Sequence, residues 1–397
     1  MRPTPDVTLV SPYPRSGTEI ETGVAAYARC LSQALAGTGA KVTVVAPGKG
    51  VDHDGPVRVE RCFSPGPLGA FRAVDAALGT GAPLVHVQHE AFLYGGPDSV
   101  PAFLLALGRL RRARRGPVVT MHQVVAPATI DRAFTDLHRV RLPAPVARVS
   151  LAALQESIAR LASRVIVHEE AFNRVIPRSV VMPLGTGGSR PPDRPAWDRA
   201  EALRAACGAG TGELLVLCFG FVAPYKGLEV ALEAARIAGP DVRFAVAGAE
   251  HPRLAGQGYL DELKRRYGDV ATFAGYVPES DVSGWFAAAD AVLLAYPQAF
   301  SSSGVLALAV EHGVAALLSL AVAEVAGLPA DLSVPLDAPG MADRLRRLSQ
   351  DRVQLSNLAE RTRRLGEGRS WPQVAQRHLN LYEEVIDAQS AARRPLG

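Results

Sequence analysis

The sequence predicts an α/β protein with two doubly wound parallel sheets, one in each half of the chain. Short apolar runs alternate with segments that place apolar residues at helical spacing, which is the pattern of a parallel sheet covered on both faces. This alternation stops once, in a Gly/Pro-rich stretch near the middle, and then resumes. The length of 397 residues also exceeds one ordinary core and suits two domains of roughly 150–200 residues.

In the first half, five apolar runs are predicted strands, and the first two are joined by a predicted helix that ends in glycine. The strands are 6–12, 41–48, 83–90, 117–124 and 164–170, and the helix is 22–39. Strands that alternate with helical segments favour parallel pairing through crossover connections. Residues 1–185 are therefore predicted to form an N-terminal domain with a Rossmann-like sheet.

The Gly/Pro-rich stretch 183–198 has few apolar residues, and the range 186–212 is predicted to be a linker. Residues 213–370 then repeat the strand–helix alternation and are predicted to form a C-terminal domain. Its strands are 213–221, 242–248, 270–277, 291–297 and 315–320, and its helices are 227–238, 257–268, 280–289 and 304–313.

Composition and charge narrow the class of protein. The chain has 43 basic and 39 acidic residues, and a net charge of +4 is too small to indicate nucleic-acid binding. Its four cysteines lie far apart without a CxxC pair, so we expect neither a disulfide framework nor a zinc site, and a reducing cytoplasm is the expected location. The N-terminal residues lead into a strand without the features of a signal peptide, and no apolar run is long enough to cross a membrane.

Candidate ligand-binding residues follow the predicted strands, because parallel sheets bind ligands at the carboxyl ends of their strands. Lys226 lies between a strand and a helix N-terminus, where a cation and free N–H groups would suit an anion, although a solvated loop lysine is the alternative. Ser302, Ser303 and Gly304 open an apolar helix directly after another strand. Gly23 begins a helix after a long loop, where the absence of a side chain would allow close approach.

Two further motifs have ordinary explanations. Asp52-His53-Asp54 resembles a metal-binding DxD motif, but its Gly/Pro neighbours favour a solvated turn, and no metal site is predicted. The arginines at 109, 111, 112, 114 and 115 could contact acidic lipid head groups at the inner membrane face. A solvated helix C-terminus, where positive charge is favourable, is the preferred interpretation.

Three segments together resemble the group 1 (family 4) retaining glycosyltransferases of the GT-B superfamily. They are FGFVAPYKG, AGYVPESDVSGWFAAADAVLLAYP and SSSGVLALAVEHG, and the resemblance extends over nearly the whole chain. It implies a GT-B fold of two Rossmann-like domains that face each other across a cleft, with a C-terminal helix at 371–390 crossing back to the N-terminal domain. It also implies sugar transfer from a nucleoside diphosphate sugar to an acceptor hydroxyl, without a metal or other cofactor.

The resemblance assigns roles to individual residues. Lys226 would neutralise the donor diphosphate, Ser302, Ser303 and Gly304 would hold its distal phosphate, and Gly23 would let the phosphate approach the N-terminal domain. Tyr276 and Val277 would line the base pocket. His122 would lie near the donor sugar, with a hydrogen-bonded core histidine as the alternative. His89 and Glu90 are candidate acceptor contacts.

The sequence also departs from the family pattern. Phe221 replaces an arginine, and Phe300 and Leu308 occupy the positions of two glutamates; Glu311, one helical turn from Leu308, is the candidate ribose contact. These differences leave two other functions open, namely altered GT-B chemistry (non-glycosidic coupling or sugar-nucleotide epimerisation) and nucleotide-sugar binding without catalysis. The donor base, the sugar, the acceptor and the oligomeric state are left undefined.

Overall fold

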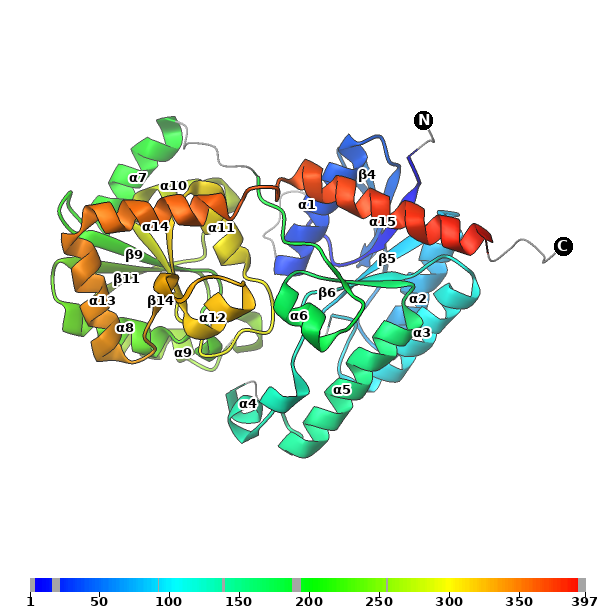
Figure 1. The fold of residues 1–397 in the computed structure, drawn as a ribbon, viewed down its shortest axis with the longest axis horizontal. Helices are drawn as coiled ribbons and strands as arrows, with labels where there is room; N and C mark the ends of the chain where they lie inside the picture. Colours follow the sequence, from blue (N-terminus) through cyan, green and yellow to red (C-terminus); the bar gives the residue numbers. More distant parts are fainter. Residues whose placement is uncertain are drawn as a thin grey trace. The chain divides into compact units, whose positions relative to one another are not determined.

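The computed structural model describes residues 4–15, 22–91, 93–137, 140–187, 194–254 and 256–391. The chain forms two compact α/β units (Figure 1). Unit 1 comprises Met1–Gly185, Phe300–Ser302 and Ser370–Gly397, and unit 2 comprises Thr186–Ala299 and Ser303–Arg369. Residues 16–21, which belong to the predicted loop before Gly23, lie outside the described part of the chain.

Unit 1 contains an eight-stranded sheet in the order β3-β4-β2-β1-β5-β6-β7-β8. All neighbouring strands pair in parallel except β3 and β4, which pair antiparallel. The strands are β1 (Val7–Val10), β2 (Val42–Pro47), β3 (Gly50–Asp54), β4 (Val57–Phe63), β5 (Leu84–His89), β6 (Val118–Met121), β7 (Arg164–Val167) and β8 (Val180–Val181). The sheet order reverses direction between β1 and β5, so this is the switch point of unit 1.

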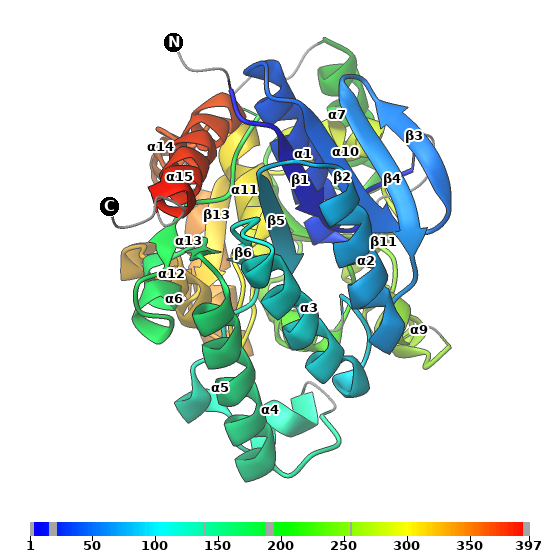
Figure 2. The same cartoon turned by 90° about the vertical axis from the view of Figure 1, so that its right-hand side faces the viewer.

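Helices cover both faces of this sheet. One face packs against α1 and the C-terminal helix α15, which contribute Leu31, Leu379 and Tyr382 to a shared apolar core. Helices α2, α3 and α5 pack on one another over the other face, as Figure 2 shows. The helices of unit 1 are α1 (Gly23–Gly37), α2 (Pro67–Gly79), η1 (Pro97–Ser99), α3 (Val100–Arg112), η2 (Pro127–Thr129), α4 (Arg132–Leu137), α5 (Ala144–Leu161), α6 (Glu170–Val175) and α15 (Trp371–Ala391).

Unit 2 contains a six-stranded, wholly parallel sheet in the order β11-β10-β9-β12-β13-β14. Its strands are β9 (Leu214–Phe219), β10 (Val242–Ala247), β11 (Ala271–Gly275), β12 (Ala291–Leu294), β13 (Ala315–Ser319) and β14 (Ser333–Val334). This is the dinucleotide-fold order 3-2-1-4-5-6, and its switch point lies between β9 and β12.

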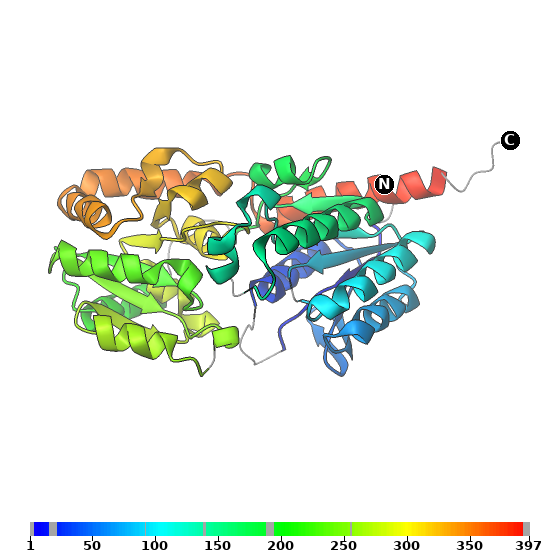
Figure 3. The same ribbon diagram turned by 90° about the horizontal axis from the view of Figure 1, so that it is seen from below.

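Two apolar cores bury the two faces of the unit 2 sheet. One lies under α8, α9, α13 and α14 and the other under α7, α10, α11 and α12. In Figure 3 each sheet has helices on both sides. The helices of unit 2 are α7 (Arg194–Ala206), η3 (Pro224–Lys226), α8 (Leu228–Ala238), η4 (Pro252–Leu254), α9 (Tyr259–Tyr267), α10 (Glu279–Ala288), α11 (Gly304–His312), α12 (Leu320–Val325), η5 (Ala330–Leu332), α13 (Ala338–Gln350) and α14 (Arg352–Arg364).

Two parts of the chain differ from the sequence-based expectation. The range 186–212, which was predicted to be a linker, contains helix α7, and this helix packs on α10. Residues 50–63 form the β3–β4 hairpin, so the predicted turn around Asp52 is wrong. Asp52 forms an ion pair with Arg61, with an Nε to Oδ2 distance of 3.0 Å. Asp54 forms an ion pair with Arg29, with an Nε to Oδ2 distance of 2.8 Å. Both carboxylates of the hairpin are therefore paired with arginines.

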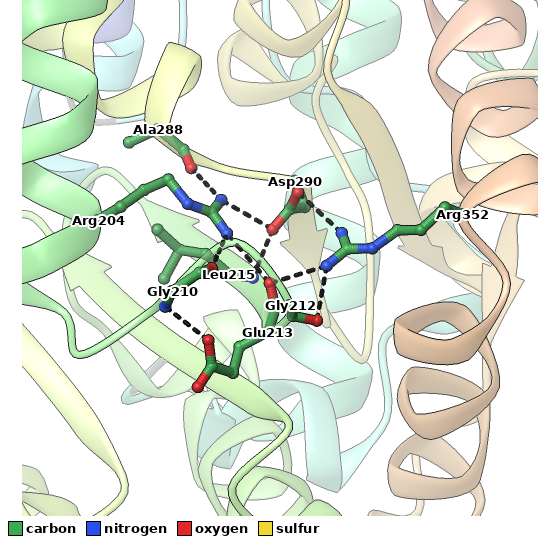
Figure 4. Close-up of polar contacts among 8 residues, drawn as sticks. All are labelled: Arg204, Gly210, Gly212, Glu213, Leu215, Ala288, Asp290 and Arg352. Atoms are coloured by element: carbon green, nitrogen blue, oxygen red, sulfur yellow. Dashed lines mark hydrogen bonds and ion pairs between the residues drawn. The ribbon is translucent and has the colours of Figure 1, made fainter.

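Arginine side chains tie α7 and α14 to the sheet of unit 2 (Figure 4). The carboxylate of Asp290 accepts hydrogen bonds from Arg204 of α7 at 2.9 Å, from Arg352 of α14 at 3.0 Å and from the N–H of Leu215 at 2.7 Å. Both guanidinium groups also donate to the carbonyl of Glu213, each at 3.0 Å. This cluster lies at the amino ends of β9 and β12, so it is remote from the strand ends that bind ligands.

Candidate functional site

Lys226 lies at the switch point of unit 2. It ends the short helix η3 after β9, and Gly227, with a left-handed φ of 66°, is both the C-cap of η3 and the N-cap of α8. A Cβ atom on Gly227 would lie 2.0 Å from the carbonyl oxygen of Ala295, so this turn requires glycine. The close approach fixes the Lys226 backbone against the end of β12.

The amino group of Lys226 is half-buried and has only neutral partners. It donates to the hydroxyl of Tyr296 at 2.9 Å and to the carbonyl of Phe219 at 3.4 Å. No carboxylate in the described part of the chain lies within ion-pair distance of it. Burial lowers the pKa of Lys226, but Tyr296 and Tyr225 raise it more and the net pKa is raised, so the side chain is charged at neutral pH. A partly buried cation without a counter-anion suits an anionic ligand.

The second element at this switch point is the N-terminus of α11. Ser303 is its N-cap, and the Ser303 hydroxyl accepts from the N–H of Leu306 at 3.2 Å. The N–H groups of Gly304 and Val305 have no acceptor among the described residues. A Cβ on Gly220 would lie 3.4 Å from Lys226 Nζ and 3.6 Å from Val305 Cγ2, so the ammonium group and the helix start lie beside the same glycine. Together they provide one cation and two N–H donors for an anion.

The predicted base-pocket residues follow β11, two strands from β9 in the same sheet. Tyr276 is 41% exposed, whereas Val277 packs against an apolar core of unit 2. Both lie at the same edge of the sheet as Lys226, because the carboxyl ends of parallel strands share one edge.

Glu311, the candidate ribose contact, makes a hydrogen bond within unit 2. Its Oε2 accepts from the N–H of Gly187 at 3.1 Å, so the carboxylate holds the chain segment that enters unit 2. Glu311 is also seven residues beyond Gly304 along α11, or about 10 Å by the rise of a helix. It therefore lies two turns from the candidate phosphate site.

Phe300 and Leu308, which replace the family glutamates, are both packing residues. Phe300 belongs to unit 1, where its ring lies 5.2 Å from that of Phe134 and its carbonyl accepts from the N–H of Val124 at 2.8 Å. Leu308 packs against an apolar core of unit 2. Ser302, also in unit 1, donates its hydroxyl hydrogen to Glu169 Oε1 at 2.8 Å. This bond, which the sequence did not suggest, directs the Ser302 side chain to a carboxylate.

In unit 1, Gly23 begins α1 close to the switch point. Thr22 is the N-cap and accepts from the N–H of Ala25 at 3.1 Å. A Cβ on Gly23 would meet no atom within 4 Å, so packing does not require glycine here. The start of the preceding loop is held by Arg61, whose guanidinium donates to the carbonyls of Tyr13 at 3.0 Å and Pro14 at 2.8 Å.

His122 is part of a hydrogen-bonded network that reaches across the sheet of unit 1. Its Nε2 donates to Gln88 Oε1 at 2.8 Å, and its Nδ1 lies 3.2 Å from His168 Nε2. His86 continues the network, with its Nδ1 2.7 Å from the hydroxyl of Tyr382 on α15. Both ring nitrogens of His122 are therefore engaged within unit 1, and the side chain is 8% exposed. This geometry favours a core histidine over the predicted sugar contact.

Burial lowers the pKa of each histidine in this region. The pKa values of His86 and His122 are well below their ordinary range, and those of His89, His168 and His378 are lowered to about 4. Of the candidate acceptor contacts, His89 is the last residue of β5 and Glu90 directly follows it. His89 packs on Phe103, and its Nδ1 is buried without a hydrogen-bond partner among the described residues.

The arginine run at the end of α3 and just after it makes contacts within the protein. Arg109 pairs with Asp75 at 2.7 Å, Arg111 donates to the carbonyl of Arg160, and Arg115 donates to the carbonyls of Gly81 and Ala82, both at 2.9 Å. These contacts favour the structural interpretation of the run. No helix in the described part of the chain is long and apolar enough to span a membrane. Within the same residues, no group of three or more His, Cys, Asp or Glu side chains could hold a metal ion.

No protein-family model and no curated protein sequence matches the chain. Solved structures do match it. Sucrose-phosphate synthase from Thermosynechococcus elongatus aligns with a TM-score of 0.74 and 20% identity over 97% of this chain and 100% of that one. The chain has the GT-B fold.

Other structures with this fold are similar over comparable lengths. Anabaena HepE in complex with UDP and glucose has a TM-score of 0.70 and 17% identity, over 96% of this chain and 99% of that one. Starch synthase IV from Arabidopsis thaliana, bound to ADP and acarbose, has a TM-score of 0.64 and 12% identity, over 96% of this chain and 99% of that one. The GT-B fold accounts for the two doubly wound sheets. It also accounts for the C-terminal helix, which packs on the N-terminal sheet.

Proposed function

We propose that this GT-B protein is a retaining glycosyltransferase that transfers a sugar from a nucleoside diphosphate donor to an acceptor hydroxyl. The observation that carries the proposal is the half-buried ammonium group of Lys226, which lacks an anionic partner and lies beside the free N–H groups of Gly304 and Val305. The GT-B neighbours that were solved with UDP, UDP-glucose or ADP support a nucleotide ligand.

In the proposed reaction, the bond between the anomeric carbon of the donor sugar and the diphosphate oxygen breaks. The acceptor oxygen then bonds to the anomeric carbon with the same configuration, and the acceptor proton leaves to the diphosphate. Negative charge grows on the diphosphate as this bond breaks. Lys226 and the α11 N-terminus would stabilise that charge, because fixed donors aimed at developing charge lower the barrier. No metal or other cofactor is invoked.

Lys226 would contribute more to stabilising the diphosphate charge than the family pattern implies, because Phe221 occupies the position of the family's arginine. We therefore predict that Lys226→Met weakens binding of the nucleoside diphosphate that the wild type binds by roughly 10- to 100-fold. This change in affinity corresponds to the loss of one charge-assisted hydrogen bond. Calorimetric titration with UDP, ADP and GDP measures this. The thermal midpoint of the variant should equal or exceed that of the wild type, since an unpaired half-buried charge is removed.

Lys264→Met is the matched control. It removes the same charge from an exposed position on α9 in the same unit and should leave nucleotide affinity unchanged. Equal affinities of wild type and Lys226→Met for the nucleotide would refute the role of Lys226. If wild type binds none of the three nucleotides, the proposed function itself is refuted.

A GT-B protein with altered chemistry is the second candidate, and the apolar residues Phe300 and Leu308 favour it. Product analysis by mass spectrometry distinguishes the two. A glycoside of the acceptor supports transfer, whereas an epimerised donor or a non-sugar adduct supports the second candidate.

A further inference from the structure

Tyr296 is a half-buried partner of Lys226 whose own role is not explained by the contacts described above. It lies two residues beyond β12, at the carboxyl edge of the unit 2 sheet. Its hydroxyl oxygen accepts the hydrogen bond from Lys226 Nζ at 2.9 Å, and the same ammonium group lies 4.9 Å from the centroid of the Tyr296 ring. A single tyrosine after a strand has no sequence signature, so only the structure identifies this pair.

The backbone of Tyr296 is held on both sides. The carbonyl oxygen of Ala295 lies against Gly227, where a Cβ atom would be only 2.0 Å from it. The carbonyl of Tyr296 itself accepts from the Ser319 hydroxyl at 2.5 Å, and the side chain packs against an apolar core of unit 2. The hydroxyl group is therefore fixed in position by the fold, which is the condition for an effective preorganised donor.

Both members of this pair retain a hydrogen-bond donor for a ligand. An ammonium group has three N–H bonds, and Lys226 uses two of them, with the Tyr296 hydroxyl and the carbonyl of Phe219 as acceptors. The hydrogen of the Tyr296 hydroxyl has no acceptor in the described part of the chain. One N–H and one O–H donor are thus left, and their heavy atoms lie 2.9 Å apart.

Two donors this close together suit two oxygens of one phosphate group. Donation from the ammonium group polarises the Tyr296 hydroxyl and strengthens the hydrogen bond that the hydroxyl itself can donate. The N-terminus of α11 lies beside the same ammonium group, because a Cβ on Gly220 would be within 3.6 Å of both Lys226 Nζ and Val305 Cγ2. All of these groups belong to unit 2.

On the basis of the proposed function, we propose that the Tyr296 hydroxyl donates a hydrogen bond to a phosphate oxygen of the donor, beside Lys226. Tyr296 is then a second residue that contacts the departing diphosphate, and it adds an uncharged donor to the single cation. Its hydrogen bond strengthens as negative charge grows on the diphosphate, so it contributes to transfer as well as to binding.

Tyr296→Phe is the informative variant, because it removes the hydroxyl and keeps the ring beside Lys226. We expect its affinity for the nucleoside diphosphate that the wild type binds to fall roughly 10-fold, as for the loss of one hydrogen bond to a charged group. Titration with UDP, ADP and GDP measures this change, by calorimetry or, where binding is weak, by NMR.

Tyr267→Phe is the matched control, since it removes a tyrosine hydroxyl elsewhere in unit 2. Tyr267 is the last residue of α9, and the chain continues from there into the amino end of β11. Its hydroxyl therefore lies near the edge of the sheet opposite to the candidate phosphate site, and the variant should bind nucleotides as the wild type does.

A double-mutant cycle distinguishes ligand contact from a role in which the hydroxyl only holds Lys226 in place. If the hydroxyl contacts the phosphate, adding Tyr296→Phe to Lys226→Met should weaken binding by roughly a further 3- to 10-fold. If it only positions Lys226, the double variant should bind as Lys226→Met does, because no ammonium group is left to position.

Equal affinities of Lys226→Met and the double variant would overturn the inference, as would equal affinities of wild type and Tyr296→Phe. In either case the proposed function stands, provided that Lys226→Met alone weakens nucleotide binding. Absence of nucleotide binding by the wild type refutes the proposed function and this inference with it.

Discussion

At the scale of single residues, two glycines at the starts of helices differ in whether the fold requires them. Gly227 has a φ of 66° and faces the carbonyl of Ala295, so its lack of a side chain is a condition for folding. Gly23 is the first residue of α1 and has open space where a Cβ would lie. A glycine that packing does not require is a better candidate for contact with a ligand.

We predict opposite effects for alanine at these two positions. Gly227→Ala should lower the free energy of unfolding by more than about 2 kcal/mol, because it combines an unfavourable φ with a backbone clash. Gly23→Ala should leave that free energy unchanged or slightly raised, since alanine favours the helix. It should nevertheless weaken nucleotide-sugar binding if phosphate approaches this helix start. Urea unfolding and calorimetry check the pair, and loss of stability in Gly23→Ala would contradict the assignment.

At the scale of elements, helix α7 is held by a few directed polar contacts. Arg204 connects it to the carbonyls of Ala288 and Gly210 and to the carboxylate of Asp290, which also receives Arg352 from α14 (Figure 4). The Asp290 side chain is 20% exposed, so these pairs are partly shielded from water. They fix helix α7 to the sheet of its own unit.

We predict that Asp290→Ala lowers the free energy of unfolding of unit 2 by about 2 kcal/mol, since two arginines and the N–H of Leu215 lose an acceptor. Asp290→Asn should lower the free energy of unfolding by a smaller amount, because its amide oxygen can still accept the hydrogen bond from the N–H of Leu215. Glu360→Ala, which breaks exposed pairs on α14, should cause no measurable change. Equal stabilities of Asp290→Ala and wild type in urea titrations would show that the cluster does not stabilise α7.

At the scale of the whole molecule, unit 1 buries five neutral histidines, at positions 86, 89, 122, 168 and 378. Two of them join α15 to the rest of the unit. His86 contacts Tyr382 at 2.7 Å, and His378 accepts from the hydroxyl of Tyr27 at 3.4 Å while its Nδ1 donates to the carbonyl of Val374. The C-terminal helix therefore packs through hydrogen bonds whose geometry depends on uncharged imidazoles.

The lowered pKa values predict that unit 1 loses stability in acid. Each histidine has a lower pKa in the folded state than the ordinary value of 6.5, so the unfolded state binds protons first. Stability should be fully present above pH 6.5 and fall as the pH decreases toward about 4. The slope should reach about 1.4 kcal/mol per pH unit for each histidine. Urea unfolding at pH 7.5, 6.5 and 5.5 measures it.

His89→Phe is the control for this pH dependence. Its ring nitrogen is buried without a partner among the described residues, so phenylalanine should cost little or nothing at pH 7.5. The variant should take up about one proton fewer on unfolding than wild type. An unfolding free energy that does not change between pH 7.5 and 5.5 would contradict the prediction.

The sequence by itself predicted two doubly wound parallel sheets, because period-2 and period-3.6 patterns are local properties of the chain, and its resemblance to the group 1 glycosyltransferases implied the GT-B fold. It also located Lys226 and the α11 N-terminus after strands β9 and β12, where the topology of a parallel sheet brings them to one edge. The β3–β4 hairpin and α7 were missed, since turn residues outweighed their weaker patterns.

Only the tertiary structure decided which polar side chains meet. The hydrogen bond between His86 and Tyr382 joins residues 296 positions apart, and that between Glu169 and Ser302 joins residues 133 apart. A histidine or glutamate has the same sequence pattern whether it is paired or available for a ligand. The structure separates the two cases because a buried polar atom must find its partner in space and not in sequence.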